Sequence, residues 1–248
     1  MCGILGFTGY VSEGRWSQTH RFLESLFVAS EARGIDATGF AAMTAPYKDR
    51  HSHGIVVKKA PVKASGFVGL PAWQSLRHRR CVSLVGHVRA ATHGNPRKNK
   101  NNHPFVGQRF ALTHNGVLKN HLDVADLFGL SLQSDCDSEV LLRLIESRPT
   151  VLDGLWACLG EVDGSMAVAV MDLADGSIWL MRNQNRPLWL AKLRGQRAWI
   201  YCSTDTIILK AIHDTGGDAG QVLETLIPIA ENTPHQLCPS GRLLAFDK

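Results

Sequence analysis

The chain has 248 residues, with 27 lysines and arginines against 22 aspartates and glutamates, and its formal net charge at neutral pH is +5. Hydrophobic residues make up 44% and charged residues 20% of it, near the globular average, which excludes a disordered or fibrous protein. No apolar run approaches the roughly 20 residues that cross a bilayer, and the N-terminus lacks the regions of a signal peptide. We therefore expect a cytoplasmic globular protein that makes no membrane contact.

Six cysteines are scattered along the chain, at positions 2, 81, 136, 158, 202 and 238. None forms a C-x-x-C pair, so neither a zinc knuckle nor a redox dithiol is expected. A disulfide framework is not expected in a chain long enough to build its own core. Most of these thiols should be small buried hydrophobes, and Cys2 differs from them because it lies one residue from the start.

In the N-terminal part the pattern predicts strands that alternate with helices. Gly3–Thr8 is a short strand-like run, and apolar residues at helical spacing predict a helix over Trp16–Ala32. Glycine can supply a left-handed turn, so we expect this helix to stop at Arg33 and Gly34. Strands are further expected at Thr38–Thr44, Gly54–Lys58, Cys81–Val88 and Arg109–Thr113, and a short helix at Ala72–His78.

A polar loop is expected over Thr92–Phe105, which is rich in glycine, asparagine and proline. Helices should follow at Leu118–Leu127, Ser138–Ser147, Val151–Leu159 and Asp205–Ile212. Strands are expected at Met166–Asp172, Ser177–Arg182, Leu188–Leu193, Ala198–Cys202, His235–Cys238 and Arg242–Phe246. Many strands, flanking helices and no visible linker predict one α+β domain over residues 1–248, built from stacked sheets and helices.

Cys2 becomes the first residue if the initiator methionine is removed. It then carries a thiol and a free α-amine on one carbon skeleton. The amine has a reference pKa of about 7.7–8.0 and the thiol of about 8.5, so the amine can act as a base near neutral pH. The residue by itself is either such a nucleophile or a cysteine buried at the head of a strand.

Five segments in order resemble the class II glutamine amidotransferases, which are N-terminal-nucleophile hydrolases. They are Met1–Gly6, Arg33–Gly39, Gly86–Gly94, His114–His121 and Ser134–Glu139. Asn102-His103-Pro104 also fits the family's loop, and the resemblance covers roughly residues 2–210. It implies a four-layer αββα sandwich and hydrolysis of the glutamine side-chain amide through a γ-glutamyl thioester on Cys2.

The resemblance also assigns the groups that would bind glutamine. Arg89 would hold the α-carboxylate through paired hydrogen bonds, or else is a solvated surface arginine. Asp137 would receive the α-ammonium, although Asp137 or Asp135 could instead cap the helix that follows. Thr92 and His93 would line the substrate pocket, His93 being equally readable as a structural hydrogen bonder.

Asn115 and Gly116 are the candidate oxyanion hole, one donating a side-chain N–H and the other a backbone N–H. Asn-Gly is also a strong hairpin signal, so the alternative for this pair is a type I′ turn. Arg33 and Asp36 resemble the family's structural ion pair beside the nucleophile, or else belong to a helix-terminus turn. No cofactor and no metal are expected, because the spacings of His87, His103, His114 and His121 match no standard zinc set.

Mixed signatures prevent assignment to a named member of the family. Ala90 stands where the glucosamine-phosphate synthase branch carries tryptophan, whereas Gly86–Arg89 looks more like the phosphoribosylpyrophosphate branch. A second departure is that roughly 40 residues after the matched region are too few for an acceptor domain. We therefore expect a glutaminase that passes ammonia to a separate synthase subunit.

Other functions stay open at this level. The chain could hydrolyse another γ-glutamyl amide, or bind glutamine as an inactive sensor. The basic clusters Arg77–Arg80 and Arg97–Lys100 would suit a nucleic-acid-binding protein, but no aromatic interleaving accompanies them and they also suit a solvated surface.

Overall fold

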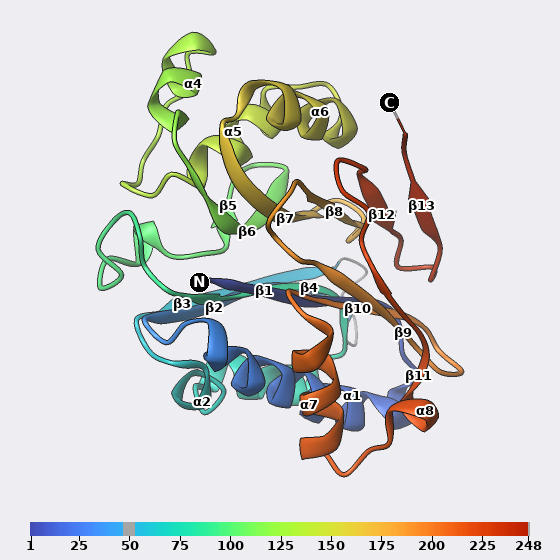
Figure 1. Ribbon diagram of the computed structural model, residues 1–248. Coiled ribbons are helices and arrows are strands. Elements are labelled where there is room, and N and C mark those ends of the chain that lie inside the picture. The colour runs from blue at the N-terminus through green and yellow to red at the C-terminus, as the bar shows by residue number, and fades with distance from the viewer. Residues whose placement is uncertain (47–52, 248) are drawn as a thin grey trace.

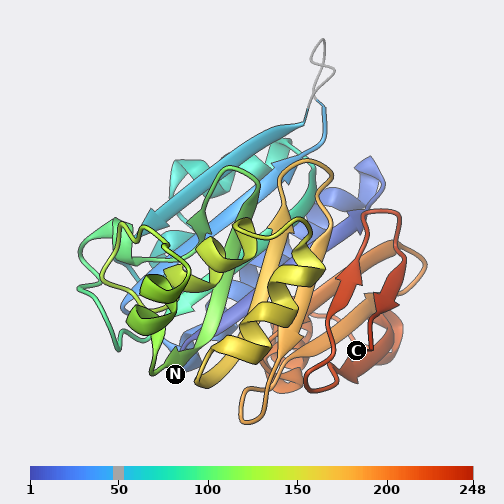
Figure 2. The same cartoon turned by 90° about the horizontal axis from the view of Figure 1, so that it is seen from above.

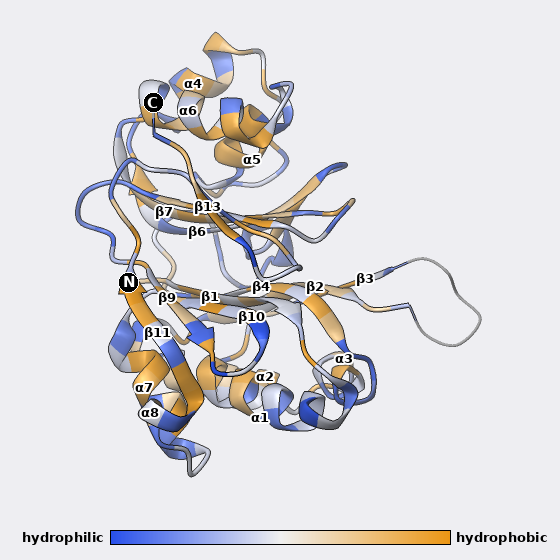
Figure 3. Cartoon of the chain, turned by 90° about the vertical axis from the view of Figure 1, so that its right-hand side faces the viewer, coloured by the Kyte–Doolittle hydropathy of each residue, from blue (hydrophilic) through white to orange (hydrophobic). Residues whose placement is uncertain are grey.

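The computed structural model describes residues 1–46 and 53–247. These residues form four layers in the order helix, sheet, sheet, helix (Figure 1). Figure 3 shows the two sheets edge-on, with helices above and below them. The expected α+β sandwich of αββα type is confirmed.

Sheet A has seven strands in the order β11-β9-β10-β1-β4-β2-β3, and all neighbours are antiparallel. Strand β1 is central, and Gly3 pairs with Val88 of β4 while Tyr10 pairs with Arg197 of β10. The strands are β1 (Gly3–Tyr10), β2 (Ala37–Thr44), β3 (Gly54–Ala60), β4 (Cys81–Arg89), β9 (Trp189–Leu193), β10 (Arg197–Cys202) and β11 (Leu223–Pro228).

Sheet B has six strands in the order β13-β12-β8-β7-β6-β5, again antiparallel. Its long hairpin β6–β7 pairs Phe110 with Asp172 at one end and Leu118 with Gly164 at the other. The strands are β5 (Phe105–Val106), β6 (Phe110–Leu118), β7 (Gly164–Asp172), β8 (Ile178–Arg182), β12 (His235–Leu237) and β13 (Leu243–Ala245).

Helices cover the outer face of each sheet. Sheet A carries α1 (Glu13–Ala29), η1 (Ser30–Arg33), α2 (Ala64–Phe67), α3 (Pro71–Gln74), η2 (Ser75–His78), α7 (Asp205–Asp214) and α8 (Ala219–Val222). Sheet B carries α4 (His121–Leu127), α5 (Glu139–Glu146) and α6 (Val151–Glu161), and Figure 2 shows α6, in yellow, lying over its strands. None of the described helices combines the length and apolar character needed to cross a membrane.

Three apolar clusters hold the four layers together, one at each interface. Side chains alternate along a strand, so Leu5 of β1 packs in the cluster with α1, whereas Ile4 packs between the sheets. In β6, Leu112 packs against α5, whereas Ala111 faces sheet A. This alternation decides which functional side chains reach the space between the sheets.

Most expected elements are confirmed within a few residues, and the differences have local causes. Gly34 does not adopt a left-handed conformation, since its φ of 175° is extended. A side chain there would collide with the backbone of Arg89 and Ala90, so close approach explains the glycine. Strand β6 runs on to Leu118, where a helix was expected, and that helix begins at His121. The elements α2, α8, β5 and β11 were not foreseen.

Candidate active site

The thiol of Cys2 is held against the end of β4. Its Sγ lies 3.3 Å from the carbonyl oxygen of Ala90 and 3.4 Å from the Ala90 backbone nitrogen, which donates to it. Arg33 Nε donates to the Cys2 carbonyl oxygen over 2.8 Å. Because β1 and β4 are hydrogen-bonded neighbours, pairing in sheet A brings residues 88 positions apart together.

Burial raises the pKa of the Cys2 thiol above its ordinary value. The Ala90 N–H and the nearby Arg89 charge lower this pKa, and the Asp137 carboxylate raises it, but desolvation is the largest effect. The thiol is therefore uncharged near neutral pH, and its reaction requires a base. Arg89 lies on sheet A and Asp137 lies just before α5 on sheet B, and both act on the thiol. Both sheets therefore contribute to this site.

Arg89, at the end of β4, is only 2% exposed. Its Nη1 donates to Asn102 Oδ1 over 2.6 Å, and its Nη2 donates to the carbonyl oxygens of His93 and, over 3.0 Å, of Gly94. A guanidinium has five N–H groups, so these three bonds leave two donors for a ligand. The surface-arginine alternative is wrong, since Arg89 is buried and fixes the loop that follows β4.

Asp137 precedes α5 and is 2% exposed. Its Oδ2 accepts the backbone N–H of Leu118 over 2.8 Å and lies 3.9 Å from His93 Nδ1. The N-cap of α5 is Ser138, which makes no side-chain cap bond, and Asp135 instead bonds Asn101 through its side chain and its backbone N–H. The capping alternative for both aspartates is therefore wrong.

Asn115 and Gly116 lie within β6, paired with Ala167 and Met166 of β7, so the hairpin-turn alternative is wrong. Asn115 has the same position in the alternation as Ala111, which faces sheet A. It is 1% exposed, and its Nδ2 has no hydrogen-bond partner among the described residues. A buried donor without an acceptor is costly, and such a group calls for a ligand.

The backbone N–H of Gly116 faces the edge of sheet B that carries Asp137. Along an antiparallel strand, N–H groups two residues apart point the same way. Leu118 N–H donates to Asp137 Oδ2. Met166, opposite Gly116, turns its backbone groups to its other side, where its N–H donates to Asn183 Oδ1 and its carbonyl oxygen accepts the Asn183 N–H. A side chain at Gly116 would overlap the Ser165 carbonyl oxygen, which explains the glycine.

Arg33 and Asp36 do not form the expected ion pair. Arg33 bonds Cys2, whereas Asp36 Oδ2 accepts the backbone N–H of Ala91 over 2.8 Å. Each side chain thus braces one side of the contact between Cys2 and β4. Thr92 is exposed in the same loop, and the His93 side chain is 43% exposed, so both can meet a ligand from solvent.

Three buried histidines join the two sheets beside these groups, and the motifs did not reveal their role. His87 Nε2 is 3.0 Å from the carbonyl oxygen of His114, and the His87 and His103 rings stack 4.0 Å apart. His114 Nδ1 is hydrogen-bonded to Ser138 Oγ at 2.7 Å. Burial lowers the pKa of His87 to about 3 and that of His114 to about 4, so both are neutral at physiological pH.

Arg186 was also missed. It lies in the loop between β8 and β9, and its Nη1 is 3.8 Å from Met1 Sδ. Its Nε is buried without a partner among the described residues. No motif quoted above includes this arginine, and only folding brings it to the N-terminus. Over residues 1–46 and 53–247, no three His, Cys, Asp or Glu side chains are grouped to hold a metal.

Comparison with known proteins agrees with this geometry. A family model described as "Glutamine amidotransferase domain" matches residues 87–210, half of the chain. The chain belongs to the class II glutamine amidotransferase domain family. The matched part of this amidotransferase domain includes Arg89, Asn115, Gly116 and Asp137, and the pairing of β1 with β4 adds Cys2 to them.

The amidotransferase domain is similar to glutamine–fructose-6-phosphate aminotransferases. It is 30% identical to that of Caulobacter vibrioides over 203 residues, covering 79% of this chain and 31% of the relative. It is 33% identical to that of Thermus thermophilus over 177 residues, covering 68% of this chain and 26% of the relative. The chain thus spans less than a third of the length of these two relatives.

A solved structure shows the same fold. Glutamine phosphoribosylpyrophosphate amidotransferase from B. subtilis superposes with a TM-score of 0.70 at 21% sequence identity. The match covers 99% of this chain and 49% of that one. The N-terminal-nucleophile hydrolase fold is thereby confirmed for the amidotransferase domain.

Proposed function

We propose that this domain hydrolyses the side-chain amide of glutamine to glutamate and ammonia through a γ-glutamyl thioester on Cys2. The observation that carries the proposal is Asn115 Nδ2, which is buried on the face of sheet B toward the Cys2 strand and has no hydrogen-bond partner in the described part of the chain. A thiol and an unused N–H donor between the same two sheets suit acyl transfer, whose intermediates bear a negative oxygen.

Removal of Met1 frees the α-amine of Cys2, which is the base in this mechanism. Met1 is 72% exposed, and its removal leaves the Arg33 bond to the Cys2 carbonyl in place. The α-amine then takes the thiol proton as Sγ attacks the amide carbon, and returns it to the leaving nitrogen as ammonia departs. Water activated by the same amine next attacks the thioester, and glutamate leaves as the thiol is restored.

The remaining groups orient glutamine. Two free N–H groups of Arg89 are proposed to bind the α-carboxylate, with Thr92 beside them, and Asp137 to bind the α-ammonium with His93 at its edge. Asn115 Nδ2 and the Gly116 N–H stabilise the oxyanion in both half-reactions. Arg33 and Asp36 hold Cys2 and the β4 end in register.

We also propose where the ammonia goes, in which compartment the protein lies and how many domains it has. The relatives that this chain resembles are named as an aminotransferase of fructose 6-phosphate and an amidotransferase of phosphoribosylpyrophosphate, which supports delivery of the ammonia to a synthase partner. All six cysteines are free, which suits the reducing cytoplasm. The sheet-to-sheet core supports treating residues 1–248 as one domain.

Mass spectrometry of the intact protein tests the nucleophile. After treatment with a glutamine analogue that carries an electrophilic carbon at the amide position, we expect loss of Met1 and one adduct on Cys2. Cys2→Ala should take up no adduct and lose at least about 10³-fold in glutamate release. Cys238→Ala, which removes another incompletely buried thiol, should behave as the parent protein.

Two outcomes would contradict the proposal. Active protein that retains Met1 excludes the α-amine as base. Release of ammonia from another γ-glutamyl amide, with no turnover of glutamine, moves the substrate to that class.

A further inference from the structure

Arg186 lies near Cys2, and the mechanism proposed above gives it no part. It stands in the loop between β8 and β9, shortly before Trp189. Trp189 pairs with Cys202 of β10, and Cys202 pairs with Leu5 of β1. The start of β9, the end of β10 and the start of β1 therefore lie at one edge of sheet A, which brings Arg186 to the N-terminus.

The backbone nitrogen of Cys2 faces the β10 side of β1. Ile4 donates its N–H to Ser203 Oγ over 2.9 Å and accepts the Ser203 N–H over 3.0 Å, just after β10. Backbone groups two residues apart along an extended chain point the same way, so the Cys2 nitrogen points to this side too. The thiol turns instead to the Ala90 backbone on the β4 side. The nitrogen and the loop of Arg186 thus share one side of the chain.

The Arg186 guanidinium is half-buried and has few partners. Its Nη1 donates to the Asn185 carbonyl oxygen over 3.2 Å and lies 3.8 Å from Met1 Sδ, whereas its buried Nε has no partner among the described residues. Glu231 lines the same surface hollow but pairs with Arg182 at 3.0 Å. No carboxylate in the described ranges forms an ion pair with Arg186, so its charge is not neutralised locally.

The charge of Arg186 reaches the groups around Cys2. Burial is the main reason that the pKa values of His114 and Arg33 are lowered, and the Arg186 charge lowers both further. The charged and titratable groups that surround the N-terminus come from both sheets. They are Arg33 of η1, Asp36 after η1, Arg89 of β4, His93 after β4, His114 of β6, Asp137 before α5, Arg186 before β9 and Cys202 of β10.

These groups have opposing effects on an amine at Cys2. The Asp137 carboxylate, which acts on the Cys2 thiol, favours a protonated amine. Arg33 and Arg89 oppose it, but their donors are bonded to the Cys2 carbonyl oxygen and to the loop after β4. Arg186 adds a third positive charge, on the side of the chain to which the nitrogen points.

We propose that the positive charge of Arg186 keeps the α-amine of Cys2 unprotonated near neutral pH, so that it can act as the base. This inference rests on the proposed hydrolysis through Cys2. An α-amine has a reference pKa of about 7.7–8.0, so most of it is protonated at pH 7 and cannot take the thiol proton. A nearby cation disfavours the protonated form and lowers that pKa. Arginine suits this task because its own charge is permanent.

The pH dependence of kcat/KM for glutamine tests the proposal, because its acidic limb gives the pKa of the base in the free enzyme. In the parent protein we expect this limb below the reference value of about 7.7. Arg186→Gln removes the charge and should move the limb upward by about one pH unit. The variant should lose about tenfold in kcat/KM at pH 6.5 and recover to within about twofold at pH 8.5. A merely structural defect would persist at both pH values.

Matched variants separate this effect from general charge and from packing. Arg186→Lys keeps the charge and should keep the acidic limb within about 0.3 pH unit of the parent value. Arg194→Gln removes the same charge at the far end of β9 and should leave the limb unchanged. Intact mass must show that Met1 is removed from every variant, because Arg186 contacts Met1. Circular dichroism melts confirm that each variant is folded.

Two results overturn the proposal. The first is a parent protein whose acidic limb lies at or above the reference value of about 7.7, which decides the matter without any variant. The second is Arg186→Gln with the acidic limb of the parent, whether its activity is retained or is lowered equally at every pH. Failure of the proposed function looks different, since the parent protein then releases no glutamate from glutamine or is active with Met1 in place.

Discussion

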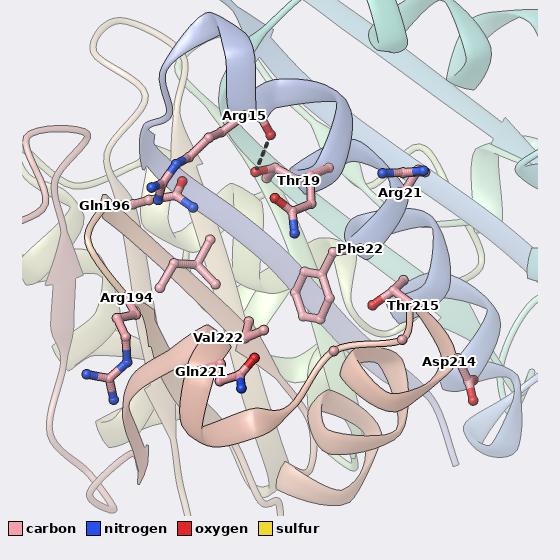
Figure 4. A pocket seen from close by; sticks show the side chains of 14 residues that line it. Arg15, Thr19, Arg21, Phe22, Arg194, Gln196, Asp214, Thr215, Gln221 and Val222 are labelled. Carbon is pink, nitrogen blue, oxygen red and sulfur yellow. Dashed lines mark hydrogen bonds between the residues drawn. The ribbon is translucent and has the colours of Figure 1, made fainter.

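The polar side chains near the two ends of strand β1 differ in burial and in hydrogen bonding. At the Cys2 end, Arg89 and Asp137 are 2% exposed, and each makes hydrogen bonds to backbone. At the Tyr10 end, Arg15 and Arg21 are exposed above an apolar floor and carry no ion pair within the described residues. Strand β1 thus runs from a buried, tightly hydrogen-bonded site to an open surface pocket that is lined by Arg15, Arg21 and Phe22 (Figure 4).

This difference shows that the burial and hydrogen bonding of a polar side chain indicate what it can do. A buried charge is tolerated only when it is bonded, so Arg89 and Asp137 are fixed in place before any ligand arrives. Catalysis needs that preorganisation. An exposed arginine costs the fold little and keeps its rotamer freedom, which suits binding but supplies no fixed geometry.

The largest expected effect on kcat comes from removing the Asn115 side-chain N–H at the Cys2 end of β1. Asn115→Leu keeps approximate side-chain volume but loses Nδ2, so kcat for glutamine should fall about 10²–10³-fold. Because that donor has no hydrogen-bond partner in residues 1–46 and 53–247, the melting temperature should stay the same or rise. Stopped assays of glutamate release and calorimetric melts measure both. A loss of stability with unchanged kcat would show that Asn115 is structural.

A smaller effect is expected from exchanging arginine for lysine at each end. Arg89→Lys keeps the charge but cannot reproduce the fork that bonds Asn102 and the loop carbonyls, so kcat/KM for glutamine should fall about 10–100-fold. Arg15→Lys is the matched change at the other end and should leave kcat/KM unchanged. Equal losses in both variants would contradict the distinction between the ends.

Acid should destabilise the Cys2 end. The folded-state pKa of His87, about 3, lies below the unfolded value of about 6.5, so the unfolded chain binds more protons between these values. The stability due to neutral His87 is therefore complete above pH 6.5 and is lost as pH falls toward 3. His114, with a pKa of about 4, acts in the same direction.

Urea unfolding at pH 7, 6 and 5 measures this loss. His87→Gln should flatten the decline of the unfolding free energy with falling pH. His213→Gln replaces a histidine whose side chain is 88% exposed, next to the pocket at the far end, and should keep the decline of the parent protein. Identical slopes in the two variants would show that His87 is not the group that titrates.

Much of the layer order could be predicted from alternation and helical spacing, but some elements could not. Leu223–Pro228 forms the edge strand β11 although it ends in proline, which an edge tolerates because it needs no donor there. His114, Asn115 and Gly116 have little strand propensity, yet they continue β6 because β7 pairs with them along its length. Tertiary pairing overrode local preference in that segment.

The amino-acid sequence by itself determined the family, the order of most strands and helices, and which residue types the chemistry requires. Only the tertiary structure decided that Arg33 and Asp36 brace separate backbones and that Gly34 makes room for β4. It also decided that Asn115 faces sheet A with an N–H that no described residue accepts. These features depend on contacts between segments far apart in the chain. Periodicity reports which face a side chain occupies, whereas the distance to its partner follows only from how the two sheets pack.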